Sequence, residues 1–179
     1  MMLSHFIRRN APRLALATAL AAASATGAMA QGGHPSTELG IFNDWGAFTT
    51  TEDGNKVCFV LSRPQQRLPA ELRRGDGYLF VTLRPSEGVT NEVALVMGFP
   101  TREEQDAQAV VDNASFSLLT SGENVWMRDP ADEPRIVEAF IRGARAEFRV
   151  TSGRGNDTTD VYSLRGFTAA LRRAQEECG

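Results

Sequence analysis

The 179-residue chain has 42% hydrophobic residues, two cysteines and a formal net charge of −3. A net negative charge argues against nucleic acid or an anionic membrane as the main partner, because both are bound through a basic face. The two histidines are His5 and His34. Ser-His-Asp and Cys-His catalysis and histidine-based zinc sites are therefore excluded from a domain that begins after them.

The first thirty residues have the three-part layout of a secretory signal peptide. A basic segment, Met1–Arg13, precedes the Ala- and Leu-rich run Leu14–Ala28, and Ala28-Met29-Ala30 forms a small-x-small cleavage site. We expect residues 1–30 to be removed on export, so that the remaining chain is periplasmic or secreted. Its 149 residues carry a net charge of −6, and no later run reaches the about 20 apolar residues of a transmembrane helix.

The exported chain is predicted to be a short lead followed by one domain. Residues 31–40 are rich in Gly, Pro and Ser and predict a flexible lead, and residues 41–179 form the predicted domain. Its β-branched and aromatic runs, separated by turn residues, are typical of short strands. In chain order we expect strands at 41–48, 56–62, 78–84, 92–98, 109–112, 115–120, 124–128, 146–151 and 160–164, a long polar loop at 63–77, and a helical turn or loop at 101–108.

Two segments have helical spacing instead. Residues 134–143 place apolar side chains at i, i+1, i+4 and i+5, with a proline in the first turn and a glycine at the end. Near the end of the chain, Phe167, Leu171, Ala174 and Cys178 share one face of a 3.6-residue period. The predicted fold is mainly β, an antiparallel β-sandwich or open barrel with two short helices, one of them C-terminal.

The two cysteines are Cys58, inside a predicted strand, and Cys178, at the end of the C-terminal helix. In an exported protein two cysteines favour one intramolecular disulfide. Two free thiols and an intermolecular bridge are the alternatives that the sequence leaves open. An intramolecular bond would fasten the C-terminal helix to the start of the domain.

The polar loop from Ser152 to Thr159 is the segment that packing explains least, so we regard it as a candidate binding loop. Its candidate residues are Arg154, Asn156 and Asp157, followed by Asp160. The Asn and Asp oxygens could hold a calcium ion, but the spacing and closing Glu of an EF-hand loop are missing. A turn that hydrogen-bonds to its own backbone explains these residues better, and we predict no metal site.

A second candidate is a binding rim formed by Trp126, Arg128 and Asp129, where a predicted strand ends in a polar exit. Aromatic residues in predicted strands more often belong to the core. No catalytic residue or cofactor is predicted, because P-loop, dinucleotide and Gly-x-Ser-x-Gly motifs do not occur. Paired carboxylates could still hydrolyse a glycosidic bond, and the adjacent acidic pairs are Glu103-Glu104, Asp132-Glu133 and Glu176-Glu177.

Several segments together carry a family resemblance: Asp44-Trp45, Cys58–Pro64, Tyr78–Pro85, Asn91–Val93, Gly98–Pro100, Trp126–Asp129, Gly153–Leu164, Gly166–Leu171 and the terminal Cys178. They resemble the invasion-associated locus B family of exported proteobacterial proteins over nearly the whole mature chain. The run from Gly153 to Cys178 is the most specific part. Many members have a further cysteine soon after the opening tryptophan, where this chain has Thr49–Thr51, so it resembles the members with a single bridge.

The resemblance implies a mostly β exported domain without established catalytic activity, and the family takes its name from a role of some members in host-cell invasion or colonisation. Related proteins also occur in free-living bacteria. We therefore expect an exported, non-enzymatic periplasmic or envelope protein that binds a protein or a cell-envelope component. The alternative from another class is a weak hydrolase of envelope polymers that uses paired carboxylates.

Overall fold

The computed structural model describes residues 35–103 and 105–179; the predicted signal peptide lies outside them. The strands are β1 (Thr37–Phe42), β2 (Trp45–Glu52), β3 (Asn55–Ser62), β4 (Gln66–Leu68), β5 (Tyr78–Arg84), β6 (Val89–Val96), β7 (Asp106–Val111), β8 (Ala114–Ser121), β9 (Asn124–Met127), β10 (Arg145–Thr151) and β11 (Asp157–Ser163). The helices are α1 (Glu133–Arg142) and α2 (Phe167–Cys178), with short 3-10 turns η1 (Pro85–Glu87) and η2 (Pro130–Asp132). None of the described helices is long and apolar enough to cross a bilayer.

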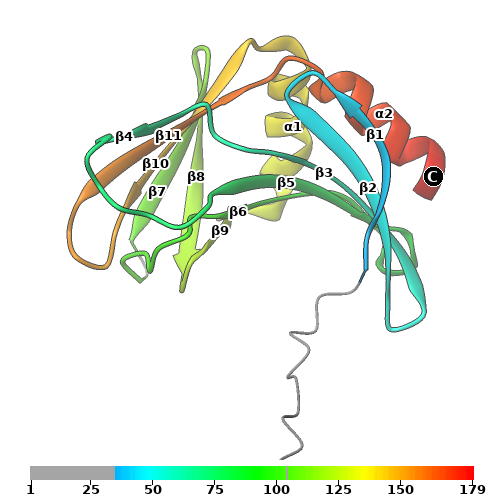
Figure 1. Cartoon of the computed structure of the whole chain (residues 1–179), viewed down its shortest axis with the longest axis horizontal. Coiled ribbons are helices and arrows are strands. Elements are labelled where there is room, and N and C mark those ends of the chain that lie inside the picture. Colours follow the sequence, from blue (N-terminus) through cyan, green and yellow to red (C-terminus); the bar gives the residue numbers. More distant parts are fainter. Residues whose placement is uncertain (1–34, 104) are drawn as a thin grey trace, which may run out of the picture. The chain divides into compact units, whose positions relative to one another are not determined.

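All eleven strands of the described residues belong to one sheet, in the order β1-β2-β3-β5-β6-β9-β8-β7-β10-β11-β4, and neighbouring strands pair antiparallel (Figure 1). The three residues Arg63–Gln65 carry the chain from β3, which pairs with β5, to β4, which pairs with β11. The Gln65 N–H donates to the Val161 carbonyl at 2.8 Å within this link. The sheet therefore curls into an open barrel, which is one of the two predicted architectures.

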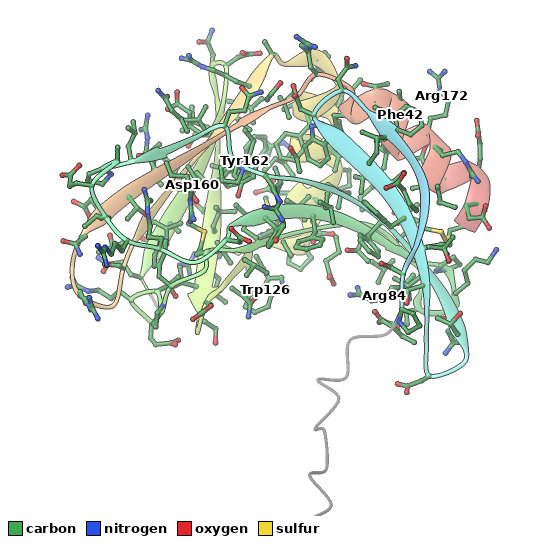
Figure 2. All side chains as sticks on the ribbon, viewed as in Figure 1. Phe42, Arg84, Trp126, Asp160, Tyr162 and Arg172 are labelled. Carbon is green, nitrogen blue, oxygen red and sulfur yellow. A yellow bond between two sulfur atoms is a disulfide. The ribbon has the colours of Figure 1, made fainter. Side chains whose placement is uncertain are left out.

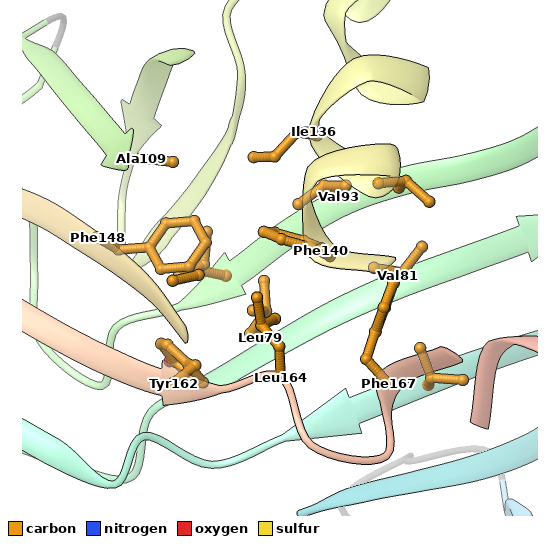
Figure 3. Packing of buried hydrophobic residues seen from close by; sticks show 14 of the residues in the cluster. Leu79, Val81, Val93, Ala109, Ile136, Phe140, Phe148, Tyr162, Leu164 and Phe167 are labelled. Carbon is orange, nitrogen blue, oxygen red and sulfur yellow. The ribbon is translucent and has the colours of Figure 1, made fainter. Parts of the chain in front are cut away.

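The core lies on the sheet face that the two helices cover. Alternate strand residues such as Val60, Val81 and Val93 point into it and are at most 1% exposed. Phe140 of α1 meets Phe167 of α2 edge-on, with ring centroids 5.4 Å apart (Figure 3). Each of these fully buried side chains contributes about 1.5–3 kcal/mol relative to an exposed one. One continuous apolar cluster thus joins both helices to the sheet.

Helix α1 forms where the sequence predicts it. Pro134 occupies its first turn, where a missing N–H costs no helical hydrogen bond. Ile136, Val137 and Phe140 form its buried face. The chain leaves the helix at Gly143, whose N–H donates to the Ala139 carbonyl at 2.8 Å. The fourth residue of the predicted apolar stripe, Ile141, is 46% exposed, so the buried face is narrower than predicted.

Helix α2 closes the chain against β3. The apolar face predicted for it is buried, and Cys178 forms a disulfide with Cys58 across a sequence separation of 120 residues. Beside this bond, Lys56 of β3 forms an ion pair with Glu177 at 2.9 Å. Hydrogen bonds from Lys56 and then Arg173 hold the pKa of the Glu177 carboxyl below its ordinary value. The end of α2 is thus fastened to one strand covalently and electrostatically.

The first predicted strand is wrong in two respects. Strand β1 begins at Thr37, inside the segment predicted as a flexible lead, because strand pairing uses main-chain groups and needs no particular composition. The single strand predicted at 41–48 is two strands joined at Asn43-Asp44. Asn43 has a φ of +52°, a left-handed conformation that asparagine tolerates and that a tight hairpin requires.

Three further boundaries differ from the prediction. The segment 63–77 contains β4, which is only three residues long and has no periodic pattern. Strand β7 begins at Asp106, within the predicted helical turn or loop. Strand β11 begins at Asp157, so the polar loop before it is shorter than predicted. In each case pairing with a neighbouring strand extends regular structure into a polar segment, which composition alone does not reveal.

Removing the disulfide is expected to destabilise the domain. Closing a loop of this length restricts the unfolded chain by about 5 kcal/mol in the chain-entropy model, and native disulfides typically contribute about 2–5 kcal/mol. The double variant Cys58→Ala/Cys178→Ala should lose an amount in that range in urea unfolding. Reductant should destabilise the unmodified protein by a similar amount and leave the double variant unchanged. An equal unfolding free energy for all four samples would contradict a structural role for the bond.

Tyr162 of β11 is fully buried, and its hydroxyl has no hydrogen-bond partner among the described residues. Burial, and then the nearby Asp160 carboxylate, raise the pKa of this phenol well above its ordinary value. The ring itself packs edge-on against Phe148, with centroids 5.5 Å apart. The ring therefore stabilises the core, while the hydroxyl carries a desolvation cost of about 1–3 kcal/mol.

Tyr162→Phe is accordingly expected to raise the free energy of unfolding by about 1 kcal/mol, because the ring remains and the unpaired hydroxyl is removed. The matched control is Tyr78→Phe. The Tyr78 hydroxyl accepts from Arg63 at 2.9 Å and donates to Asp76 at 3.3 Å, so its loss should cost about 0.5–1 kcal/mol. Urea unfolding of the three proteins measures both effects, and a clear destabilisation by Tyr162→Phe would contradict the assignment.

Candidate functional site

Three segments that are far apart in the sequence line a pocket of about 600 Å³. One is the loop after β4, around Leu72–Gly75, and the second is the β6–β7 connection at Gly98–Pro100. The third is the β10–β11 turn with the start of β11, from Ser152 to Thr158. This volume is within the range of small-molecule sites, and we call this feature the arginine pocket because three of its lining residues are arginines.

The β10–β11 turn forms a fixed wall of the arginine pocket. The Ser152 N–H donates to the Asn156 carbonyl at 2.8 Å, and the Ser152 hydroxyl oxygen accepts from the Asn156 N–H at 3.0 Å. Gly155, with a φ of +84°, permits this tight reversal. The Gly153 N–H donates to the Pro100 carbonyl at 2.8 Å. The turn is therefore hydrogen-bonded within itself and to the neighbouring wall.

The other two walls meet through glycine. The Gly75 N–H donates to the Gly98 carbonyl at 2.8 Å. Gly98 has a φ of +66°, and a Cβ on it would lie 2.5 Å from the Asp76 carbonyl oxygen. Any larger residue at position 98 would push the two loops apart, so glycine sets how closely these walls approach.

Arg67 of β4 holds the loop after it in place. Its Nε donates to the Asp160 carboxylate at 3.0 Å, and its terminal nitrogens donate to the carbonyls of Gly75 and Met97 at 2.5 and 2.7 Å. Asp160 itself is fully buried on the inner face of β11. A single guanidinium thus joins the end of β6, the loop and β11.

Arg74 is the second partner of Asp160, at 3.2 Å, and its side chain is only 6% exposed. It also donates to the carbonyls of Leu68 and Pro69 at 3.3 and 2.9 Å. Burial lowers the pKa of the Arg74 guanidinium, while the Asp160 carboxylate acts in the opposite direction and Arg67 adds to the lowering. An arginine remains charged at physiological pH despite such a shift, so Arg74 places a fixed positive charge in the pocket wall.

The arginine pocket is electropositive within a chain of net charge −3. Arg73, Arg74 and Arg154 line it, and no Asp or Glu is among its described lining residues. Arg73 and Arg154 are exposed and have no hydrogen bond or ion pair to any residue in the described ranges. Their guanidinium donors are therefore available on two different walls of the pocket.

The structure separates the four residues predicted as a binding loop. Arg154 and Asn156 line the arginine pocket. Asp160 lies behind it as the partner of two arginines, and Asp157 is exposed and accepts from the Thr151 hydroxyl at 2.9 Å. Residues three apart in a strand project from opposite faces, so Asp157 and Asp160 do not share a site. Within the described residues no group of three His, Cys, Asp or Glu side chains could hold a metal ion.

The predicted rim residues Trp126, Arg128 and Asp129 do not line the arginine pocket. Trp126 of β9 pairs with Ala94 on the sheet face opposite the core and is half-buried. Arg128 forms an ion pair with Asp106. Asp129 accepts from the Ala131 N–H at 2.9 Å and begins η2. A binding role for these three residues stays a prediction, separate from the pocket.

Sequence reasoning missed Arg67, Arg73 and Arg74, because they lie in a segment interpreted only as a polar loop. The available signal was the number of arginines between Arg63 and Gly77, which is four, against two acidic residues, Glu71 and Asp76. Of the acidic pairs considered for hydrolysis, no described member lines the arginine pocket, and Glu104 lies outside the described residues. Asp132 pairs with Arg135, and Glu177 pairs with Lys56.

The chain is thus an antiparallel open-barrel domain with a disulfide-bonded C-terminal helix and an arginine-lined pocket. The family described as Invasion associated locus B (IalB) protein matches residues 45–175, and the chain belongs to this family. The fold is also similar to the crystal structure of invasion associated protein B from Bartonella henselae, with a TM-score of 0.59 and 20% sequence identity, covering 80% of this chain and 100% of that one. At that identity the likeness shows the fold alone. No curated protein matches the sequence significantly.

Asp160→Asn is expected to lower the free energy of unfolding by about 3–5 kcal/mol, because it leaves the Arg74 guanidinium buried without its counter-charge. The matched control is Asp157→Asn, three residues earlier on the exposed face of the same strand, which should change stability by no more than about 0.5 kcal/mol. Urea unfolding compares the two variants. Equal effects would show that the buried ion pair does not hold the pocket wall.

Proposed function

We propose that the protein is an exported, non-enzymatic envelope protein that binds a protein or cell-envelope partner at the arginine pocket. Family membership supports export and a link to invasion or colonisation, and the signal-peptide layout of residues 1–30 supports a periplasmic or secreted location. The observation that carries the proposal is the pocket itself. It contains the Gly153–Thr158 part of the segment that most specifically carries the family resemblance.

Binding is favoured over catalysis by the chemistry of the lining. Paired carboxylates are needed for general acid and base work on a glycosidic bond. The described lining of the arginine pocket instead contains three arginines and the side chains of Ser152, Asn156 and Thr158. The Thr158 hydroxyl donates to the Val150 carbonyl at 2.6 Å, so it is already engaged in the barrel wall. Such a lining is suited to holding a ligand.

In-cell crosslinking tests this proposal. A photo-crosslinking amino acid at Asn156, whose side chain is exposed in the pocket and makes none of the turn's hydrogen bonds, should capture a discrete partner in the periplasmic fraction of living cells. The same amino acid at Arg172, on the exposed side of α2, is the matched control. Figure 2 shows Arg172 far from the pocket-side residue Asp160. Equal adducts from both positions, or none from Asn156, would refute binding at the pocket.

A further inference from the structure

Among the described residues that line the arginine pocket, no Asp or Glu side chain balances the charge of the arginines. Asp160 neutralises one of its two arginine partners, so Arg67, Arg74 and Asp160 together have a net charge of +1. Arg73 and Arg154 each add a further positive charge. Glu71 acts through its charge on Arg74 and offsets one of these charges. Four arginines and two carboxylates therefore leave a local charge of about +2 around one cavity of a chain that is acidic overall. A concentration of positive charge of this kind attracts an anion in proportion to the anion's own charge.

The three lining arginines differ in what they can do. Arg74 is 6% exposed and uses both terminal nitrogens on Asp160, Leu68 and Pro69. Arg74 therefore contributes a positive charge at a fixed position, but few N–H groups that are free to bind a ligand. Arg73 and Arg154 are exposed on two different walls of the pocket, and a planar guanidinium group can donate to two oxygens of a tetrahedral anion. The pocket thus combines one positive charge held in place with two exposed arginine side chains that can adjust to a ligand.

Uncharged polar side chains of the β10–β11 turn add hydrogen-bond donors that an anion could accept from. The Ser152 hydroxyl oxygen accepts from the Asn156 N–H, which leaves its own proton to donate. The Asn156 side-chain amide has no hydrogen bond to any residue of the described chain. A volume of about 600 Å³ is far larger than a bare phosphate or sulfate ion. A ligand that fills this volume would extend beyond its anionic group and would be about the size of a substituted sugar.

We infer that the arginine pocket binds the phosphate monoester group of a sugar-sized ligand. This inference rests on the proposed binding function and names the ligand class. A phosphate monoester carries a charge of about −1.5 to −2 at neutral pH, with three acceptor oxygens. It matches the surplus positive charge better than a carboxylate, which carries a single negative charge and two oxygens.

Isothermal titration calorimetry on the full exported chain tests the ligand class with glucose 6-phosphate, glucuronate and glucose. Glucose 6-phosphate should bind, glucuronate should bind at least about tenfold more weakly, and glucose should give no heat. Arg73→Gln and Arg154→Gln should each weaken binding by about tenfold, since each removes a charged hydrogen-bond donor. Both residues are exposed and unpaired among the described residues, so the variants should fold, as circular dichroism verifies.

Arg172→Gln is the matched control, because it removes the same charge from the exposed side of α2 and should leave the affinity unchanged. Raising the salt from 50 to 300 mM should weaken binding of the phosphate in the unmodified protein. Equal affinity for glucuronate, or no effect of either pocket substitution, overturns the inference.

A phosphate monoester occurs both on soluble sugars and on lipid headgroups, and co-sedimentation with vesicles separates the two. Vesicles of phosphatidic acid present the monoester, and vesicles of phosphatidylglycerol present a singly charged diester. We expect neither to sediment the chain, because its negative net charge is repelled by an anionic surface. Sedimentation by phosphatidic acid alone, lost in Arg154→Gln, would assign the monoester to a lipid. Sedimentation by both vesicles alike, without glucose 6-phosphate binding, would refute the inference.

The crosslinking experiment separates this inference from the proposed function. An Asn156 adduct that persists in an Arg73→Gln/Arg154→Gln background would keep the pocket as a binding site and overturn the phosphate ligand. Phosphate binding in solution without any Asn156 adduct in cells would support the ligand class and contradict the proposed partner.

Discussion

The buried carboxylate of Asp160 organises one side of this domain. It receives two guanidinium groups, from Arg67 and Arg74, and both also donate to main-chain carbonyls. A buried carboxylate is tolerated only when such partners satisfy it. The loop after β4 has little regular structure, so its position against β11 and the end of β6 follows from these bonds. The pocket wall is therefore a consequence of one charge cluster and not of apolar packing.

The opposite side is held differently. There α2 lies against β3 through an apolar face, and the disulfide between Cys58 and Cys178 fixes its end. Trp45 links this side to β11, because its indole N–H donates to the Ser163 carbonyl at 2.9 Å and its ring meets Phe167 edge-on. The arginine pocket does not lie on this side, where a disulfide and aromatic contacts hold α2 to the sheet. It lies on the side of β4 and β11, where ion pairs to Asp160 hold the loop in place.

Much of the fold was predictable because its signals are local. Helix α1 follows from apolar spacing between a proline and a glycine, and most strands follow from β-branched and aromatic runs. Strand β4 was not predictable, because three residues have no period. The pairing of Arg67 with Asp160 joins residues 93 positions apart, and no local pattern records it.

Part of the site was nevertheless within reach of the sequence. Tyr162 is buried, and Asp160, two residues before it, shares its face of the strand. From that alternation Asp160 could have been predicted as a buried residue and not as part of the binding loop. A buried acidic residue requires a cationic partner. Arg67 and Arg74, both in the same long connection, were the matching half of the signal. Only the three-dimensional arrangement shows that the two halves meet.

The segment Asn55–Leu68, which contains both β3 and β4, has a consequence for how the barrel is assembled during export. Its first part needs α2 as a covalent partner, and its last part needs β11 as a pairing partner. Both partners are among the final elements of the chain. A chain that crosses a membrane from its N-terminus therefore emerges almost completely before its barrel can close, and contacts of such high sequence separation form slowly. The unclosed chain exposes strand edges during this interval, and such edges can pair with other chains.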